Sequence, residues 1–463
     1  MLEAKTSRLT KLAACFAVLG FIFILQITVI RDATMWKVKL AYMLSISHWE
    51  WDLDGSNNGE ISCDTSHKEF DICSVDTPAL LDPSLLTLST LGPHTWAQPH
   101  IPFKIHPYPL KNDKNAISYV RELTLTSSPP KSSCDITHHT PALIFSAGGY
   151  NGNFYHEINE NFIPLFITIN SLFPDQNVVL VITDGRIWWF QKYAELLSAF
   201  SPYHKVINTN NITTTHCFPS ATIGLIKHGP IIINPKLLPH PKTLLDFRAF
   251  LQNAYTKSST NTPLNYMLQN NSSRLNTTDQ NSDEHPKPRL ILLSRSGNAS
   301  RVILNQDEVI KLAEEVGFNV HVLEPSRKSS MANIYNMIHT SHVLLGVHGA
   351  GLTNSLFLRP GSVLVQVVPI GTDWASKTYY EKPTEILGLQ YIEYKIEANE
   401  SSLSLSYGAD SLVIKDPATY LKEKGANKRI YLKKQNLEIN IFRFRKCLAK
   451  AYEKAKIFMS SIN

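Results

Sequence analysis

Short apolar runs alternate with helical stretches in two blocks of the sequence, and this alternation limits the fold more than any other feature. In the first block, PALIFSAGG and VVLVITD flank the helical pattern NFYHEINENFIPLFITINSLF. In the second block, RLILLSR, FNVHVLEP and HVLLGVHGAG alternate with NQDEVIKLAEEVG and MANIYNMIHTS. Apolar strands that alternate with helices are typical of α/β domains with a parallel sheet. The sequence therefore predicts an α/β fold with two such domains.

The domain boundaries follow from length and composition. The chain has 463 residues, and a single core stops growing at about 250 to 300 residues. We expect one α/β domain over 96–255 and a second over 289–436. Residues 256–288, rich in Asn, Ser and Thr, are predicted to form a linker. Residues 31–95, rich in turn formers, are predicted to form a stem, and residues 437–463 an amphipathic closing helix.

An apolar segment without a charge, LAACFAVLGFIFILQITVI, occupies residues 12–30. As a helix it is about 28 Å long, close to the bilayer core of about 30 Å. Lys5, Arg8 and Lys11 precede it, and such cations mark the cytosolic side. A cleaved signal peptide has a shorter apolar region that ends in small residues. We therefore expect a transmembrane anchor, with residues 1–11 in the cytosol and the rest of the chain in the lumen.

A lumenal body predicts secretory-pathway chemistry. Of the six cysteines, one lies in the apolar segment and the others follow it, so an odd number leaves one thiol unpaired. Cys63 and Cys73 are spaced to close a small loop in an oxidising compartment. N-glycosylation patterns occur at Asn211, Asn270, Asn271, Asn276, Asn298 and Asn399. Such patterns also arise by chance, so we expect fewer than all to carry glycans.

Several classes of function are disfavoured. The net charge of +6 is small for this length and no Lys/Arg tract occurs, so no nucleic acid is expected as partner. Serine hydrolases and P-loop enzymes are disfavoured because their GxSxG and Walker motifs are absent. Asp52 and Asp54 have the spacing of an acidic metal motif but lie in the predicted stem, and the pair His138 and His139 lacks a nearby third ligand. We therefore predict no metal site.

The strongest local pattern is HVLLGVHGAGLTNSLFL at 342–358, in which an apolar strand enters a glycine-rich turn and then a short helix. Glycines let the backbone approach a ligand closely, and a helix N-terminus attracts anions. The pattern therefore predicts a diphosphate cradle, although a tight turn without a ligand explains the same letters. The candidate binding residues of this segment are His348, Gly349, Ala350, Gly351, Thr353 and Asn354.

Two arginines, Arg295 and Arg301, flank the end of the strand RLILLSR. Guanidinium groups near a diphosphate stabilise the charge that develops on a departing nucleotide. A solvated loop is the alternative interpretation. The glycosylation pattern at Asn298 lies between them, and a glycan there would crowd a binding cleft.

A polar stripe is predicted at the start of the first long helix. Asn153, His156, Glu157 and Glu160 follow the spacing of one helix face, and Gly149 belongs to the glycine-rich loop before it. A solvated face is the plain alternative. A histidine and two carboxylates directly after a strand and a glycine-rich turn also lie where α/β sheets bind ligands. Any of the three is suited to take a proton from a hydroxyl group as a general base.

These motifs, taken in order, resemble plant glycosyltransferase family 61 over about residues 60 to 450. The resemblance rests on CDITHHTPALIFSAGGYNGNFYHEINENF, VVLVITD, WWFQKY, HCFPSATIGLIKHG, SRVILNQDEV and GVHGAGLTNSLFLRPGSVLVQVVP. The segment ISCDTSHKEFDIC also resembles the cysteine-bearing start of the xylan-modifying branch, and the sequence departs from that branch at SVDTPALLDP.

The resemblance implies a GT-B architecture, in which two Rossmann-like domains face each other across a cleft, and an inverting pentosyltransferase. It implies UDP-xylose or UDP-arabinofuranose as donor and a xylan-type acceptor. Because the body has no acidic pair at metal-binding spacing and carries the arginines and the glycine turn instead, we also predict that no cofactor is required. By the family pattern, His156 and Glu160 face the acceptor, while Arg295, Arg301 and the segment 348–354 face the donor. Relatives often carry Asp at the position of Glu160, so the choice of base among His156, Glu157 and Glu160 stays open.

The implied location is the Golgi membrane, where the protein would be a single-pass type II protein with a lumenal body. A complex with other Golgi glycosyltransferases is a further expectation.

Two other functions fit the same motifs. One is the β-1,2-xylosyltransferase that modifies the core of N-glycans, and the other is a non-catalytic Golgi scaffold or lectin-like subunit of the same fold. The donor pentose, the linkage and the oligomeric state stay open.

Overall fold

The computed structural model describes residues 61–91, 102–127, 130, 132–210, 212–259, 286–297, 299–423 and 425–462. From Cys63 onward the chain forms one compact unit. The predicted cytosolic tail and anchor, and most of the predicted linker, lie outside the described residues. Among the helices that are described, none is long and apolar enough to cross a membrane.

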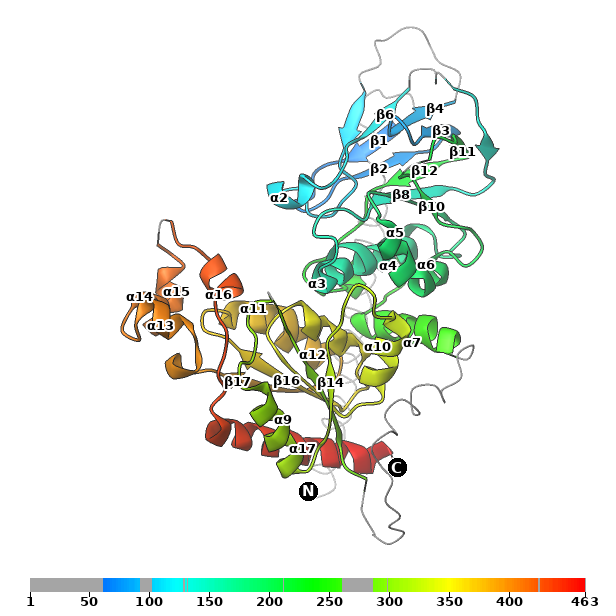
Figure 1. The fold of residues 1–463 in the computed structure, drawn as a ribbon. Coiled ribbons are helices and arrows are strands. Elements are labelled where there is room, and N and C mark those ends of the chain that lie inside the picture. Colours follow the sequence, from blue (N-terminus) through cyan, green and yellow to red (C-terminus); the bar gives the residue numbers. More distant parts are fainter. Residues whose placement is uncertain are drawn as a thin grey trace, which may run out of the picture. The chain divides into compact units, whose positions relative to one another are not determined.

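A five-stranded, fully parallel sheet, here called sheet C, forms the centre of the second predicted domain. Its strand order is β14 (Asn319–Leu323), β13 (Arg289–Leu293), β15 (Val343–Val347), β16 (Val363–Val368) and β17 (Gln390–Lys395). Figure 1 shows α9 (Gln306–Val316) and α17 (Ile441–Ile462) on one face, and α10 (Met331–His339), α11 (Asp373–Ser376) and α12 (Lys382–Ile386) on the other. The predicted closing helix is thus α17, and the α/β prediction is confirmed.

Both faces of sheet C are buried, which explains the unbroken apolar runs in the sequence. In β13, Leu290 and Leu292 pack in a core with α9 and α17. Ile291 and Leu293, which point to the other face, belong to a larger core with α10. That larger core also contains Phe145 and other residues of the first predicted domain, so continuous packing joins the two predicted domains.

The first predicted domain holds two six-stranded sheets. Sheet A has the order β1 (Ile61–Asp64), β2 (Ile72–Val75), β12 (Ala221–Ile223), β8 (Ala142–Ser146), β9 (Val179–Thr183) and β10 (Ile207–Asn208). Sheet B has the order β5 (Phe103–Ile105), β6 (Leu123–Thr126), β4 (Thr87–Thr90), β3 (Ala79–Asp82), β11 (His216–Phe218) and β7 (Ile136–Thr137). From β12 through β10, sheet A is parallel.

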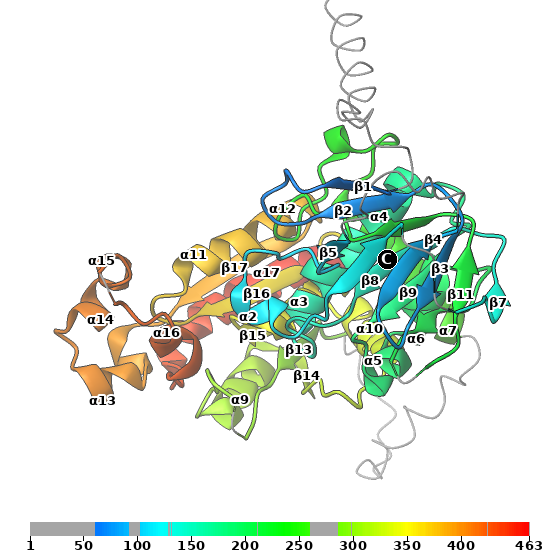
Figure 2. The same ribbon diagram turned by 90° about the horizontal axis from the view of Figure 1, so that it is seen from above.

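The predicted stem over 31–95 needs a correction. Residues 61–90 form β1 to β4 and pair with strands of the first domain, as the two views in Figure 1 and Figure 2 show. These strands have four residues each, too few to show a periodic apolar pattern between the surrounding turn formers. This segment therefore belongs to the folded body.

Helices of the first domain lie after the strands of sheet A. They are α3 (Phe154–His156), the π-helical segment η2 (Glu157–Phe162), α4 (Ile163–Leu172), α5 (Ile187–Lys192), α6 (Ala194–Phe200) and α7 (Leu244–Ser259), with α2 (Lys114–Ile117) before β6. The π-helical turn matters for the site, because it widens the helix where a regular α-helix was predicted. In sheet C the corresponding turn is the 3₁₀ segment η5 (Ala350–Phe357) after β15.

A small helical group follows sheet C, formed by α13 (Leu403–Tyr407), α14 (Leu412–Lys415), α15 (Pro417–Tyr420) and α16 (Arg429–Lys433). It has its own apolar core around Tyr431 and lies beyond the β17 edge in both ribbon views (Figure 1 and Figure 2).

The cysteines pair in two bridges. Cys63 and Cys73 form a disulfide with an S–S distance of 2.05 Å, and Cys134 bonds Cys217 of β11. The second bridge was not predicted, because the sequence gives no indication that residues separated by 83 positions meet at one sheet edge. Cys447 on α17 is the free thiol among the described residues and is half-buried.

Candidate active site

The glycine-rich turn after β15 is shaped around an arginine. Gly349 has φ 149°, and a Cβ atom added there would lie 1.9 Å from Nη2 of Arg295. A side chain at this position therefore cannot coexist with the observed position of Arg295. At Gly351, by contrast, an added Cβ would meet only Leu293 Cδ1 at 3.8 Å, an ordinary contact. The first glycine of the turn is thus required by packing and the second is not.

The structure brings the two predicted arginines together. Arg295 Nη1 donates to the Ser300 carbonyl at 3.1 Å, and Arg301 Nη1 donates to the His348 carbonyl at 2.9 Å. Arg301 is only 8% exposed, and its Nε has no hydrogen-bond partner. No carboxylate pairs with either guanidinium among the residues that the structure describes. Burial, together with the positive charge of Arg295, lowers the pKa of Arg301 to about 10.

This uncompensated positive charge defines what the turn can bind. Burying like charges without a counter-charge is unfavourable, so an anion placed beside the arginines relieves the cost. Arg301 itself adopts φ 63°, a strained conformation for a side chain of this type, and such strain is concentrated at functional sites. Two guanidinium groups beside a helix start therefore suit a diphosphate.

His348 supports the turn from behind. Its Nδ1 lies 2.8 Å from Nε2 of Gln366, whose Oε1 accepts from the Tyr391 hydroxyl at 2.8 Å. The ring is 5% exposed, and burial, with the charges of Arg301 and Arg295, lowers the pKa of His348 to about 3. The imidazole is therefore neutral, with Nδ1 as acceptor. Its carbonyl holds Arg301, so His348 positions the arginine.

A cavity of about 410 Å³ lies at the carboxyl ends of β13, β14 and β15, where parallel sheets bind ligands. The predicted residues Arg295, Ala350, Gly351, Asn354 and Asn153 line it. The other predicted donor-side residues, Arg301, His348, Gly349 and Thr353, are not among the residues that line it. Asn354 Nδ2 donates to the Gly351 carbonyl at 2.7 Å, and its buried Oδ1 has no partner. Asn354 therefore offers the cavity an unused acceptor.

Three residues of the cavity were missed by the sequence analysis. The guanidinium of Arg327 lies over the Trp188 ring, 5.2 Å from its centroid, and Lys192 Nζ donates to the Ser326 carbonyl at 2.6 Å. These contacts tie α5 to the segment after β14. WWFQKY contains two of the residues, but the sequence alone cannot separate Trp188 from Trp189, which is buried in the core.

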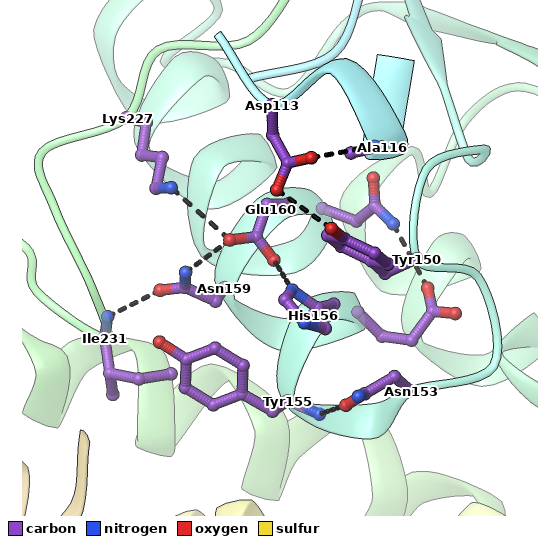
Figure 3. A network of polar contacts seen from close by, with 12 residues as sticks. Asp113, Ala116, Tyr150, Asn153, Tyr155, His156, Asn159, Glu160, Lys227 and Ile231 are labelled. Atoms are coloured by element: carbon purple, nitrogen blue, oxygen red, sulfur yellow. Dashed lines mark hydrogen bonds and ion pairs between the residues drawn. The ribbon is translucent and has the colours of Figure 1, made fainter. Parts of the chain in front are cut away.

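His156 and Glu160 form a pair at the junction of α3 and η2. His156 Nδ1 lies 2.9 Å from Glu160 Oε2, and the histidine side chain is 24% exposed. A carboxylate only accepts hydrogen bonds, so Nδ1 carries the hydrogen, and the neutral form of the ring has its lone pair at Nε2. Figure 3 shows the ring between Tyr150 and Tyr155, and the Tyr150 ring centroid lies 4.4 Å from that of His156. This arrangement is suited to proton abstraction at Nε2.

The carboxylate of Glu160 is buried, and both of its oxygens have polar partners. Asn159 Nδ2 donates to Oε1 at 2.5 Å, and Lys227 Nζ lies 3.4 Å from the same oxygen (Figure 3). Lys227, which is 3% exposed, also lies 3.3 Å from Glu69 Oε2. Glu160 thus serves to hold and charge-balance the histidine, with little room to act as the base itself. Lys227 was not among the predicted site residues.

Glu157, also predicted as a catalytic candidate, has a different environment. It is 1% exposed, and its oxygens accept from the Gly152 amide at 2.7 Å, Trp189 Nε1 at 2.6 Å and Asn161 Nδ2 at 3.1 Å. Burial raises its pKa to about 7, although these donors oppose the rise. The structure therefore gives Glu157 the role of anchoring the glycine loop, because the π-helical turn separates it from the predicted stripe.

The two remaining acceptor-side candidates have structural roles. Asn153 caps α3, its Oδ1 accepting from the Tyr155 amide at 3.1 Å, and it lines the arginine cavity. Gly149 has φ 61°, and an added Cβ would lie 2.4 Å from the ring of Tyr108. The glycine is therefore needed for close packing of its loop on a buried tyrosine.

The described residues hold few candidates for a metal or glycan site. Within them, no group of three or more His, Cys, Asp or Glu is placed to hold a metal ion. Asn399 is exposed in η7 (Ala398–Glu400), so its glycosylation pattern is accessible. The patterns at Asn211, Asn270, Asn271, Asn276 and Asn298 start at residues outside the described part of the chain.

Comparison with known proteins identifies the family. The family profile of Glycosyltransferase 61 matches residues 154–365, which include both residue clusters of the site. The chain is 37% identical to xylan glycosyltransferase MUCI21 of Arabidopsis thaliana over 404 residues, 85% of this chain and 80% of the relative.

Two rice proteins (Oryza sativa subsp. japonica) are also similar. Alpha-1,3-arabinosyltransferase XAT3 is 32% identical over 84% of this chain and 65% of its own length. Beta-1,2-xylosyltransferase XYXT1 is 33% identical over 75% of this chain and 71% of its own length. The resemblance noted in the sequence is thereby confirmed. The protein is a glycosyltransferase, and its chain belongs to glycosyltransferase family 61.

Proposed function

We propose that the protein is an inverting glycosyltransferase that moves a pentose, xylose or arabinofuranose, from a UDP-sugar to a xylan-type polysaccharide. The names of the relatives support the reaction class, because they include xylan glycosyltransferase, arabinosyltransferase and xylosyltransferase. Two domains with parallel sheets and a cavity lined by both support a GT-B arrangement. The two disulfides support an oxidising lumen, and we place the protein in the Golgi membrane.

One observation carries the donor assignment. Arg301 is buried and Arg295 is half-buried beside the glycine turn, and neither has a carboxylate partner in the described part of the chain. A UDP diphosphate supplies the missing negative charge, and the arginines stabilise the charge that grows on UDP as the sugar bond breaks. This role needs no divalent metal, since the cationic side chains and the oriented amides at the start of η5 provide the stabilisation.

The His156–Glu160 pair supplies the base. His156 Nε2 takes the proton of an acceptor hydroxyl, and the acceptor oxygen forms a bond to the anomeric carbon of the donor. The bond from that carbon to the diphosphate breaks on the opposite face, so the configuration inverts and UDP leaves with the electron pair. Glu160 stabilises the imidazolium that results, as a buried carboxylate does for a catalytic histidine.

A donor screen on the full-length protein in detergent tests this proposal. The protein is incubated with individual UDP-sugars and either xylohexaose or an N-glycan core substrate, and the anomeric configuration of the product is determined by NMR. We expect transfer from one UDP-pentose with inversion. Transfer only to N-glycan core substrates would replace xylan by the N-glycan core as the acceptor. Binding of UDP-sugars without transfer to any glycan would favour a scaffold.

A further inference from the structure

A strip of three aromatic side chains leads from His156 to the surface of the C-terminal domain. The Tyr155 ring meets His156 edge-on at a centroid distance of 5.3 Å, and Tyr155 contacts Tyr379 at 5.0 Å. Tyr379 in turn contacts Trp374 at 5.8 Å. None of the three lines the cavity that holds Arg295. The strip is therefore separate from the proposed donor site and ends at the proposed base.

The outer end of the strip is exposed. Trp374, on α11, is 47% exposed, and within the described residues its one ring contact is with Tyr379. The hydroxyls of Tyr155 and Tyr379 have no hydrogen-bond partner in the described part of the chain. Beside Trp374, Asp373 pairs with Lys395 at 2.9 Å, which gives the strip a polar rim. The exposed indole and the two half-buried tyrosines form one contiguous aromatic surface next to the proposed base, and contiguous apolar surfaces of this kind mark binding sites.

Both tyrosines of the strip lie in or next to a π-helical segment of the backbone. Tyr379 lies in η6 (Lys377–Glu381), a π-helical segment, and Tyr155 lies directly before the π-helical segment η2. Such single π-helical turns are frequent at functional sites. The two segments present the two tyrosine rings to each other across the domains.

The chemistry of the strip favours a neutral sugar over a phosphate. Burial, followed by the negative charge of Glu160, raises the pKa of both Tyr155 and Tyr379. The hydroxyls therefore stay neutral donors, and the three aromatic side chains offer an anion no positive charge. A pyranose ring has apolar C–H faces that pack on aromatic rings and a rim of hydroxyls that bond to tyrosine hydroxyls and charged side chains.

We propose that Tyr155, Tyr379 and Trp374 form the binding strip for the xylan acceptor chain, in which Trp374 contacts a sugar remote from the one that receives the pentose. This inference rests on the proposed function, because it takes the chain acceptor from it. The strip predicts that long acceptors bind better than short ones. It also predicts that this preference depends on the exposed indole.

Titration calorimetry with xylo-oligosaccharides, without donor, tests the strip on the full-length protein. We expect Trp374→Ala to weaken xylohexaose binding about tenfold, and to change xylobiose and UDP binding little. Trp374→Phe should restore part of the loss, since a smaller ring still stacks. Phe442→Ala is the matched control, because Phe442 is 88% exposed on α17, outside the strip.

The outcomes separate this inference from the proposed function. Equal xylohexaose affinity in Trp374→Ala and the wild type would overturn the strip, as would an equal loss of xylobiose binding. Failure of the wild type to bind xylohexaose would overturn the strip and the xylan acceptor together. Wild-type binding of xylohexaose that depends on Trp374, without transfer from any UDP-sugar, would leave the strip standing and remove the proposed catalysis.

Discussion

Two charged clusters of the molecule differ in whether the protein completes them. In the acceptor-side cluster, formed by His156, Glu160 and Lys227, the buried carboxylate meets a cation and a histidine. In the donor-side cluster, formed by Arg295 and Arg301, the two guanidinium groups donate to carbonyl oxygens and meet no carboxylate within the described residues. The acceptor-side cluster is balanced without a ligand. The donor-side cluster has no counter-charge in the part of the chain that the structure describes, and in our proposal the diphosphate supplies it.

This difference indicates how the two halves of the reaction are prepared. A neutral hydroxyl needs a base whose position and charge are already fixed, and the acceptor-side cluster fixes them with hydrogen bonds. A diphosphate brings its own charge, so a preformed positive site binds it and keeps stabilising it as it departs. Variants in the two clusters should therefore fail in different ways.

The largest difference should appear in turnover. His156→Ala removes the base, so kcat should fall about 10²-fold or more, while UDP affinity stays unchanged. Glu160→Gln should also lower kcat, since it removes the charge that stabilises the imidazolium. Steady-state kinetics and UDP titration measure both effects. Full activity of both variants would mean that the acceptor-side cluster has a structural role and takes no part in catalysis.

The second-largest difference should appear in the free energy of unfolding, which substitutions in the two clusters should change by different amounts. Lys227→Met leaves Glu160 as a buried charge with less compensation, so we expect a loss of about 3 kcal/mol in the free energy of unfolding. Arg295→Met removes an uncompensated charge, so the ligand-free protein should lose little stability. Chemical denaturation of the full-length protein without UDP measures both. Equal destabilisation by the two substitutions would contradict the contrast between the clusters.

The glycine turn gives a matched pair of variants. Gly349→Ala places a methyl group on Arg295 and should weaken UDP binding about tenfold, by analogy with the loss of one charge-assisted bond. Gly351→Ala meets only an ordinary contact and should leave the fold and Arg295 in place. UDP affinity distinguishes them. Similar affinities in both variants would mean that the fit between Gly349 and Arg295 is unimportant for donor binding.

The smallest expected effect concerns acid stability. The folded-state pKa of His348 is lowered to about 3, whereas an unfolded histidine titrates near 6.5. Protons therefore bind the unfolded chain first as the pH falls below 6.5, and the folded state loses stability, by about 2 kcal/mol between pH 7 and pH 5. His348→Asn, which keeps an acceptor for Gln366, should reduce this slope. Identical slopes in denaturation series from pH 7 to pH 5 would contradict the prediction.

Much of the donor side was predictable from the sequence. The apolar runs that end at Arg295 and at the glycine turn are adjacent parallel strands, and the carboxyl ends of adjacent parallel strands lie side by side. The meeting of Arg295 with Gly349 follows from that rule. What the rule does not give is the fit between them, which depends on a single φ angle and on the path of one side chain.

The acceptor side was predictable only in part. The spacing predicted that His156, Glu157 and Glu160 share one helix face; the structure pairs His156 with Glu160, while Glu157 at the start of the π-helical turn has other partners. Lys227 could not be predicted, because it lies 67 positions from Glu160 and meets it only through the folding of sheet A. Helical periodicity assumes a regular helix, and long-range ion pairs leave no periodic pattern.

The central claim is that the donor-side cluster is built for the diphosphate of UDP through its arginines. Calorimetric titration of UDP into the full-length protein tests this claim most directly, with and without a strong chelator of divalent metals, for the wild type and Arg295→Met. We predict that the chelator leaves the wild-type affinity unchanged and that Arg295→Met weakens binding by at least about tenfold. Affinity that the chelator abolishes and the substitution leaves intact would contradict the account, because the diphosphate would then be held by a metal ion.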